Sequence, residues 1–97
     1  MKGYLIANVD VHDREGFEKY RDEVAPLVAK FGGRYLVRGG EVRNVEGDLG
    51  LKRLVLLEFP TLEDAQRFYD SPEYAPVLQM RLNCSNSDVA LVAGYEG

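Results

Sequence analysis

Three segments of this chain are apolar at odd and at even positions alike. In residues 4–11, 52–59 and 88–95, aliphatic, β-branched and aromatic side chains would point to both faces of a sheet. The two helical regions that the sequence predicts can cover only one of those faces. The second face needs another cover, and in a chain of 97 residues a second copy of the same chain is the simplest one.

The predicted elements follow the order β-α-β-β-α-β, which is typical of a ferredoxin-like α+β fold with a four-stranded antiparallel sheet. Asp13 is predicted to cap the first helix, and Gly32-Gly33 to end it. Thr61 and Ser71 are predicted to cap the two parts of the second helical region. The expected strands are residues 4–11, 34–38 continued by 41–45, 52–59 and 88–95, and the expected helices run between 13 and 32, from 61, and from 71 to about 82.

Two local irregularities are expected within these elements. Pro26 lies inside the first helix and is predicted to kink or briefly break it, because proline lacks the backbone donor. Gly39-Gly40 interrupts the second strand and is predicted to form a bulge or a sharp bend. No linker or repeat is present, so we expect one domain over residues 1–97.

The charge balance limits the classes of partner. The net charge is −4, and the basic residues are spread among carboxylates, so neither nucleic acid nor an anionic membrane surface is expected to bind. Cys84 is the only cysteine, no apolar run is long enough to span a bilayer, and the first residues do not resemble a signal peptide. We therefore expect a cytoplasmic protein. With one histidine and one cysteine in different segments, only a carboxylate-rich metal site could be built, so we expect no metal and no cofactor.

Short motifs occur in a fixed order along almost the whole chain. They are Tyr20, the run Gly32-Gly33-Arg34-Tyr35-Leu36-Val37-Arg38-Gly39-Gly40, Glu46-Gly47, Glu58-Phe59-Pro60, Ala65, Ser71-Pro72-Glu73-Tyr74 and Arg81. In these motifs the chain resembles the domain-of-unknown-function family 1330. The resemblance implies membership of the dimeric α/β-barrel superfamily, in which two ferredoxin-like sheets pack face to face. It implies no particular reaction, because that superfamily includes cofactor-independent monooxygenases, lactone isomerases, haem-dependent enzymes and ligand-sensing modules.

Polar side chains on the apolar strands are the first candidates for a ligand site between the sheet and the helices. Arg38 is the strongest, because two glycines follow it and a guanidinium can hold a carboxylate or an enolate oxygen through two parallel hydrogen bonds. Strict alternation would place Arg38 on the same face as Arg34 and Leu36. Asn8 and Glu58 are the other candidates on strands. Alternatively, Arg38 and Glu58 form a structural ion pair across neighbouring strands.

Further candidates lie on the helices and on one turn. Tyr20, Tyr69 and Tyr74 are predicted to face inward, where they either pack in the core or line a ligand pocket. Arg81 either points into the same space or binds nearby carbonyl groups. His12 is the only histidine and could act as a general base, but its place just before a helix cap equally suits an exposed turn residue.

Two functions remain open from the sequence. The first is an enzyme of small-molecule metabolism, a cofactor-independent oxygenase or isomerase that acts on a small anionic metabolite held by Arg38. The second is a non-catalytic ligand-binding or stress-associated dimer that uses the same residues. The lack of a well-placed general base favours the second, whereas turnover of a bound ligand would establish the first.

Overall fold

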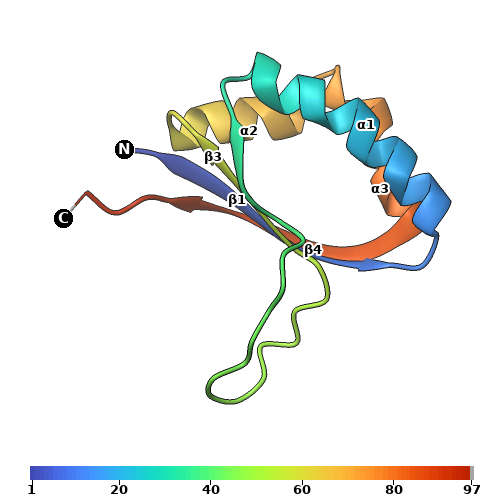
Figure 1. Cartoon of the computed structure of the whole chain (residues 1–97). Helices are drawn as coiled ribbons and strands as arrows, with labels where there is room; N and C mark the ends of the chain where they lie inside the picture. Colours follow the sequence, from blue (N-terminus) through green and yellow to red (C-terminus); the bar gives the residue numbers. More distant parts are fainter. Residues whose placement is uncertain (97) are drawn as a thin grey trace.

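Four strands form one antiparallel sheet, and three helices pack on one of its faces (Figure 1). This computed structural model describes residues 1–96, so the last residue of the expected 1–97 domain lies outside the described residues. The elements are β1 (Gly3–Val11), α1 (Arg14–Lys30), β2 (Arg34–Arg38), β3 (Leu54–Phe59), α2 (Leu62–Asp70), α3 (Tyr74–Cys84) and β4 (Ser85–Ala93). The strand order β2-β3-β1-β4, with every neighbouring pair antiparallel, confirms the predicted ferredoxin-like α+β fold.

Side chains cap the helices as the sequence predicts. The Asp13 carboxylate and the Thr61 hydroxyl each accept a hydrogen bond from the backbone N–H three residues further on, at 3.2 and 3.0 Å. Ser71 Oγ accepts one from the backbone N–H of Tyr74 at 3.1 Å, and the regular part of α3 begins at Tyr74. These three caps fix where each helix leaves the sheet.

The predicted break at Pro26 is wrong. α1 runs without interruption from Arg14 to Lys30. Phe17, Val24 and Val28 are buried on both sides of the proline, and this packing holds the helix although one backbone hydrogen bond is missing. No helix within the part of the chain that the structure describes is long and apolar enough to cross a membrane.

The connection between β2 and β3 differs most from expectation. The predicted continuation of the second strand over residues 41–45 is wrong, and β3 begins at Leu54 rather than at position 52. Gly39 has a φ of +70°, which ends β2 and turns the chain out of the sheet. The last strand also begins early, at Ser85, because α3 passes directly into β4.

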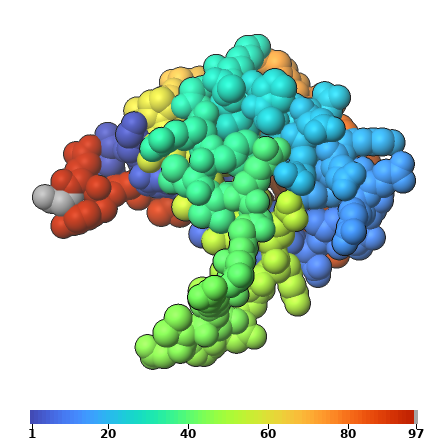
Figure 2. All heavy atoms as spheres, viewed as in Figure 1, coloured from blue at the N-terminus to red at the C-terminus, as the bar shows by residue number. Residues whose placement is uncertain are grey.

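Residues 39–53 form an extended loop, here called the arm. The arm projects from the sheet on the side away from the helices and stands clear of the rest of the molecule (Figures 1 and 2). Asn8 holds its base, since the side-chain amide donates to the carbonyl of Gly50 at 3.1 Å and accepts from the N–H of Lys52 at 2.8 Å. A backbone bond of 2.8 Å from Gly39 to Leu54 closes the base.

The hydrophobic core lies between the sheet and the helices. On the sheet side it consists of alternate residues of β1 and β3, and on the helix side of one face of each helix. Its buried members are Leu5, Ala7, Val9, Leu57 and Phe59 from the strands, and Phe17, Val24, Val28, Ala65, Phe68, Tyr74, Val77 and Cys84 from the helices.

The opposite side of the sheet, here called the outer face, has no helix on it. Ile6 of β1 remains 39% exposed, Leu36 of β2 40% and Val92 of β4 49%. Tyr4 and Asn8 share this face with Ile6. The structure thus confirms the expectation that the helices cover only one face of a sheet whose strands are apolar on both.

Candidate functional site

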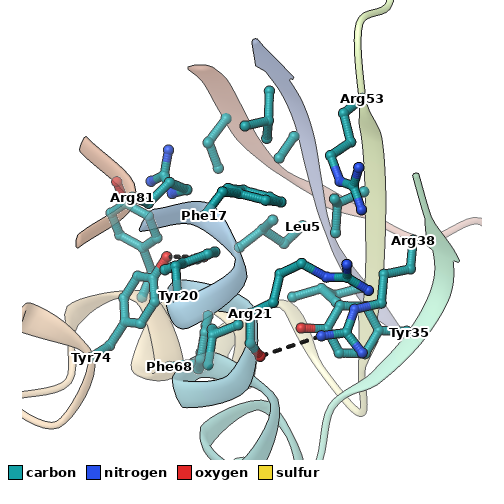
Figure 3. A pocket seen from close by; sticks show the side chains of 17 residues that line it. Leu5, Phe17, Tyr20, Arg21, Tyr35, Arg38, Arg53, Phe68, Tyr74 and Arg81 are labelled. Carbon is teal, nitrogen blue, oxygen red and sulfur yellow. Dashed lines mark hydrogen bonds between the residues drawn. The ribbon is translucent and has the colours of Figure 1, made fainter. Parts of the chain in front are cut away.

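A pocket lies inside the helix-covered side of the molecule, between α1, α2 and α3 and the strands β1, β2, β3 and β4 (Figure 3). Its free volume is about 40 Å³, which is room for a few water molecules and well below the roughly 300–1,000 Å³ of sites for drug-sized ligands. Most of its wall is apolar, and this part consists of Leu5, Ala7, Val9, Phe17, Val24, Val55, Leu57, Phe68 and Val89.

A β-bulge in β2 directs Arg38 into this pocket. Tyr35 pairs with Leu57, and after one extra residue at Leu36, Arg38 pairs with Val55. Leu57 and Val55 both line the pocket, so Tyr35 and Arg38 face it together. The alternation that grouped Arg38 with Leu36 is therefore wrong. Of the two alternatives predicted for Gly39-Gly40, the sharp bend is present at Gly39, whereas the bulge lies earlier in the strand.

Arg21, Arg38 and Arg53 lie at one end of the pocket, here called the mouth (Figure 3). Arg38 stacks on the ring of Tyr35 at 4.3 Å and donates through Nη2 to the backbone carbonyl of Arg21 at 3.3 Å. Arg53, at the second root of the arm, lies 5.1 Å from the centre of the Phe17 ring. Burial, together with the charges of Arg21 and Arg38, lowers the pKa of the Arg53 guanidinium. The three cations therefore repel one another across the mouth.

Hydroxyl groups and a fourth arginine lie at the other end of the pocket, here called the inner end. The phenol oxygens of Tyr20 and Tyr74 are hydrogen-bonded at 2.9 Å, and the ring of Tyr69 packs 5.8 Å from that of Tyr74. Arg81 is 4% exposed and donates to the hydroxyl of Ser87. Burial and the neighbouring Tyr74 raise the pKa of Tyr20 far above its usual range, so this phenol stays protonated.

The charges of these four arginines are not balanced within the protein. Over residues 1–96 no carboxylate lies within ion-pair distance of Arg21, Arg38, Arg53 or Arg81. None of the residues that line the pocket is Asp, Glu or His. The Nε atom of Arg21 is buried and has no hydrogen-bond acceptor among the described residues. Of the four arginines only Arg81 is buried, and it has a hydrogen-bond partner; Arg21 and Arg53 are partly buried and Arg38 is exposed. The mouth is therefore a positively charged site in which water still reaches the cations.

The structure brings together five of the eight residues that the sequence singles out. Arg38, Tyr20, Tyr69, Tyr74 and Arg81 all line the pocket. They come from β2, α1, α2 and α3, which are distant along the chain. The three tyrosines and Arg81 face inward, as the helical spacing indicates.

The other three residues lie elsewhere. Glu58 is on the outer face, where it binds Arg34 at 2.9 Å and accepts a hydrogen bond from Tyr4, so the alternative of an Arg38–Glu58 ion pair is wrong. Asn8 holds the base of the arm. His12 is an exposed turn residue that borders a separate surface hollow next to the mouth.

Among the polar residues of the lining, sequence reasoning missed three: Arg21, Tyr35 and Arg53. Arg53 could have been predicted, because it lies two positions before Val55 in the expected strand, and residues two positions apart point to the same face of a sheet. Arg21 could not, since it follows Tyr20 on a helix and reaches the mouth with a long side chain. Among residues 1–96 no group of three or more potential metal ligands is found.

The architecture and the pocket define the class of this protein: a ferredoxin-like α+β domain with an aromatic, positively charged pocket between its sheet and its helices. Within that class the chain belongs to the family described as domain of unknown function DUF1330, whose model matches residues 2–95. No match is found among curated proteins.

Several solved structures share the fold at low sequence identity. A protein of unknown function from Rhodopseudomonas palustris has a TM-score of 0.75 and 14% identity, over 99% of this chain and 84% of its own. The cofactor-independent oxygenase SnoaB from Streptomyces nogalater has a TM-score of 0.63 and 15% identity, over 99% and 95%. A dimeric ferredoxin-like protein of unknown function from Jannaschia sp. CCS1 has a TM-score of 0.66 and 10% identity, over 97% and 100%. At these identities the similarity concerns the fold.

Proposed function

We propose that this protein binds a compact organic anion in the pocket between its sheet and its helices. The observation that carries the proposal is the convergence of Arg21, Arg38, Arg53 and Arg81 on one apolar space without a carboxylate partner. An anion at the mouth relieves the repulsion among three of these cations and gives the Nε of Arg21 an acceptor. The apolar wall and the small free volume favour a short aliphatic body, and a single-ring body would require side chains at the mouth to move.

If the bound anion reacts, cofactor-independent oxygenation or isomerisation of an enolisable acid is the chemistry that suits the pocket. Guanidinium groups stabilise an enolate or phenolate oxygen, and that charge is the one that develops when such a substrate loses a proton. The substrate would have to arrive already ionised or lose its proton to water, because the lining residues include no carboxylate and no imidazole. SnoaB, which has the same fold, is a cofactor-independent oxygenase.

The absence of a base among the lining residues also supports a second function, binding without conversion. Tyr20 stays protonated, and arginine does not accept protons under ordinary conditions. In this case the protein is a ligand-responsive or stress-associated dimer. The two functions share one pocket and differ only in whether the ligand is changed.

We further propose that two copies of the chain pack through their outer faces. Ile6, Leu36 and Val92 leave apolar surface exposed there, and a second copy related by two-fold symmetry would cover it on both chains at once. Related folds from Jannaschia sp. CCS1 and Thermobifida fusca are described as dimeric.

The anion proposal is tested by calorimetric titration of the purified protein with pyruvate, benzoate and salicylate. Each acid is paired with its neutral amide, which has nearly the same shape. We expect at least one acid to bind and its amide not to bind, and we expect Arg38→Leu to weaken that binding by about tenfold or more, since a lost charge-assisted hydrogen bond costs about 1.5–3 kcal/mol.

The control variant is Arg67→Leu, which removes the same charge from the exposed surface of α2, away from the pocket. Equal binding of acids and amides, or equal loss of binding in both variants, would contradict the anion site. Oxygen consumption and product analysis with the acid that binds then separate an oxygenase from a binding protein.

A further inference from the structure

The arm exposes apolar side chains that nothing in its own chain covers. All of residues 41–50 are exposed. Val45 is 93% exposed and Leu49 77%, and both lie on a segment that stands clear of the molecule (Figure 2). Isolated surface residues of this kind are common, but here two of them lie four positions apart on one projecting loop, which makes this loop a candidate contact with another body.

The arm nevertheless has a defined shape. The Asp48 carboxylate accepts from the backbone N–H of Gly50 at 2.8 Å and from the side-chain amide of Asn44 at 3.3 Å, which closes the tip. Asn8 binds the base at two points. A loop that is tied at both its tip and its base loses little entropy when it binds a partner.

The arm lies on the same side of the sheet as the outer face. Its base is tied to Asn8, which lies on the outer face, and the arm extends from that side of the sheet (Figure 1). Any body that covers the outer face therefore meets the arm as well. If this body is a second copy, two-fold symmetry brings the arm of each subunit into contact with the other subunit, so both arms are buried in one interface.

The charge of the arm gives no reason to favour a membrane as the partner. Over residues 39–53 three acidic side chains, Glu41, Glu46 and Asp48, are balanced by three basic ones. An anionic lipid surface attracts segments that carry an excess of basic residues. A protein surface with mixed charge is the better match.

We propose that the arm is the clasp of the homodimer: Val45 and Leu49 of each copy pack against the body of the other, next to the contact between the outer faces. This inference rests on the proposed packing of two copies through the outer face. It goes beyond that packing, because it assigns to residues 39–53 a part of the interface that the sheet alone does not supply.

The test is sedimentation velocity of the full chain over a wide range of concentration. We expect the wild type to dimerise, and Val45→Asp and Leu49→Asp each to raise the dimer dissociation constant by about a hundredfold or more, because each substitution is present twice in a dimer and burial of such a side chain contributes about 1.5–3 kcal/mol. Ala75→Asp is the matched control, since it places the same charge on an exposed position of α3 in the helix layer and should leave the dimer unchanged.

Ile6→Asp separates the two proposals. A wild type that is monomeric at every concentration overturns both the outer-face dimer and the clasp. If Ile6→Asp disrupts the dimer while both arm variants keep the wild-type dissociation constant, the clasp is wrong and the outer-face dimer stands. Circular dichroism establishes that each variant is folded, and the exposure of both arm positions makes folding of these variants the expected result.

Discussion

Arg53 is one of the three arginines at the mouth of the pocket. Its substitution measures how much the repulsion among their charges lowers the stability of the folded protein. Because burial and the charges of Arg21 and Arg38 lower the pKa of Arg53, its positive charge is unfavourable in the folded protein. Methionine keeps an apolar chain against Phe17 and removes the charge. We expect Arg53→Met to raise the free energy of unfolding by about 0.5–1 kcal/mol at low salt, as measured by urea denaturation.

The salt dependence of this increase in the free energy of unfolding identifies its origin. Ions screen the repulsion among the three cations, so the difference between Arg53→Met and the wild type should shrink as salt is added. Arg67→Met serves as the control, because Arg67 forms an ion pair with Asp64 and its loss should not stabilise the protein. If Arg53→Met is less stable than the wild type at low salt, the positive charge of Arg53 is stabilised by an interaction other than the contacts described above.

At the scale of single elements, the bulge in β2 marks the limit of what the sequence predicts. Leu5, Ala7 and Val9 lie in the core together because alternate residues of a strand share a face, but the sequence, apolar at odd and even positions alike, does not predict which face. The helical spacing correctly turns Tyr20 inward. One extra residue reverses the face of every later residue of a strand, and no local residue type announces where it is inserted. The order of the elements was therefore predictable, whereas the way Arg38 enters the pocket was not.

The close approach of α2 to the sheet depends on the first residue of β1. A Cβ atom added to Gly3 would lie 2.4 Å from the Cα of Leu62 and 2.6 Å from the carbonyl oxygen of Thr61, both of which are backbone atoms at the start of α2. Backbone cannot rotate away as a side chain can, so α2 would have to move. We expect Gly3→Ala to destabilise the protein by about 3 kcal/mol, measured by thermal unfolding.

Gly40 provides the comparison for this substitution. It has no positive φ, and a Cβ atom there would meet nothing within 4 Å. Gly40→Ala should therefore leave the midpoint of thermal unfolding unchanged or raise it slightly, since alanine reduces the entropy of the unfolded chain. Equal destabilisation by both substitutions would mean that the fit of α2 against β1 is looser than these distances indicate.

At the scale of the whole molecule, the arm connects the two proposed sites. Its two roots are Arg38 and Arg53, which are also two of the three cations at the mouth of the pocket. Gly39 lies against Arg53 so closely that a Cβ atom there would be 2.9 Å from its guanidinium carbon. A second copy that holds the arm therefore also restrains the groups that hold an anion.

This connection predicts that dimerisation and anion binding favour each other. Ordering the roots of the arm costs entropy, and whichever partner binds first reduces that cost for the second, with equal effects in both directions. We expect a saturating acid, for example benzoate if it binds in the calorimetric titration, to lower the dimer dissociation constant about fivefold or more, which is the usual lower range of such coupling. Benzamide should have no effect, and Arg38→Leu should abolish the effect of the acid. A dissociation constant that is the same with and without the bound acid would mean that the arm and the pocket act independently.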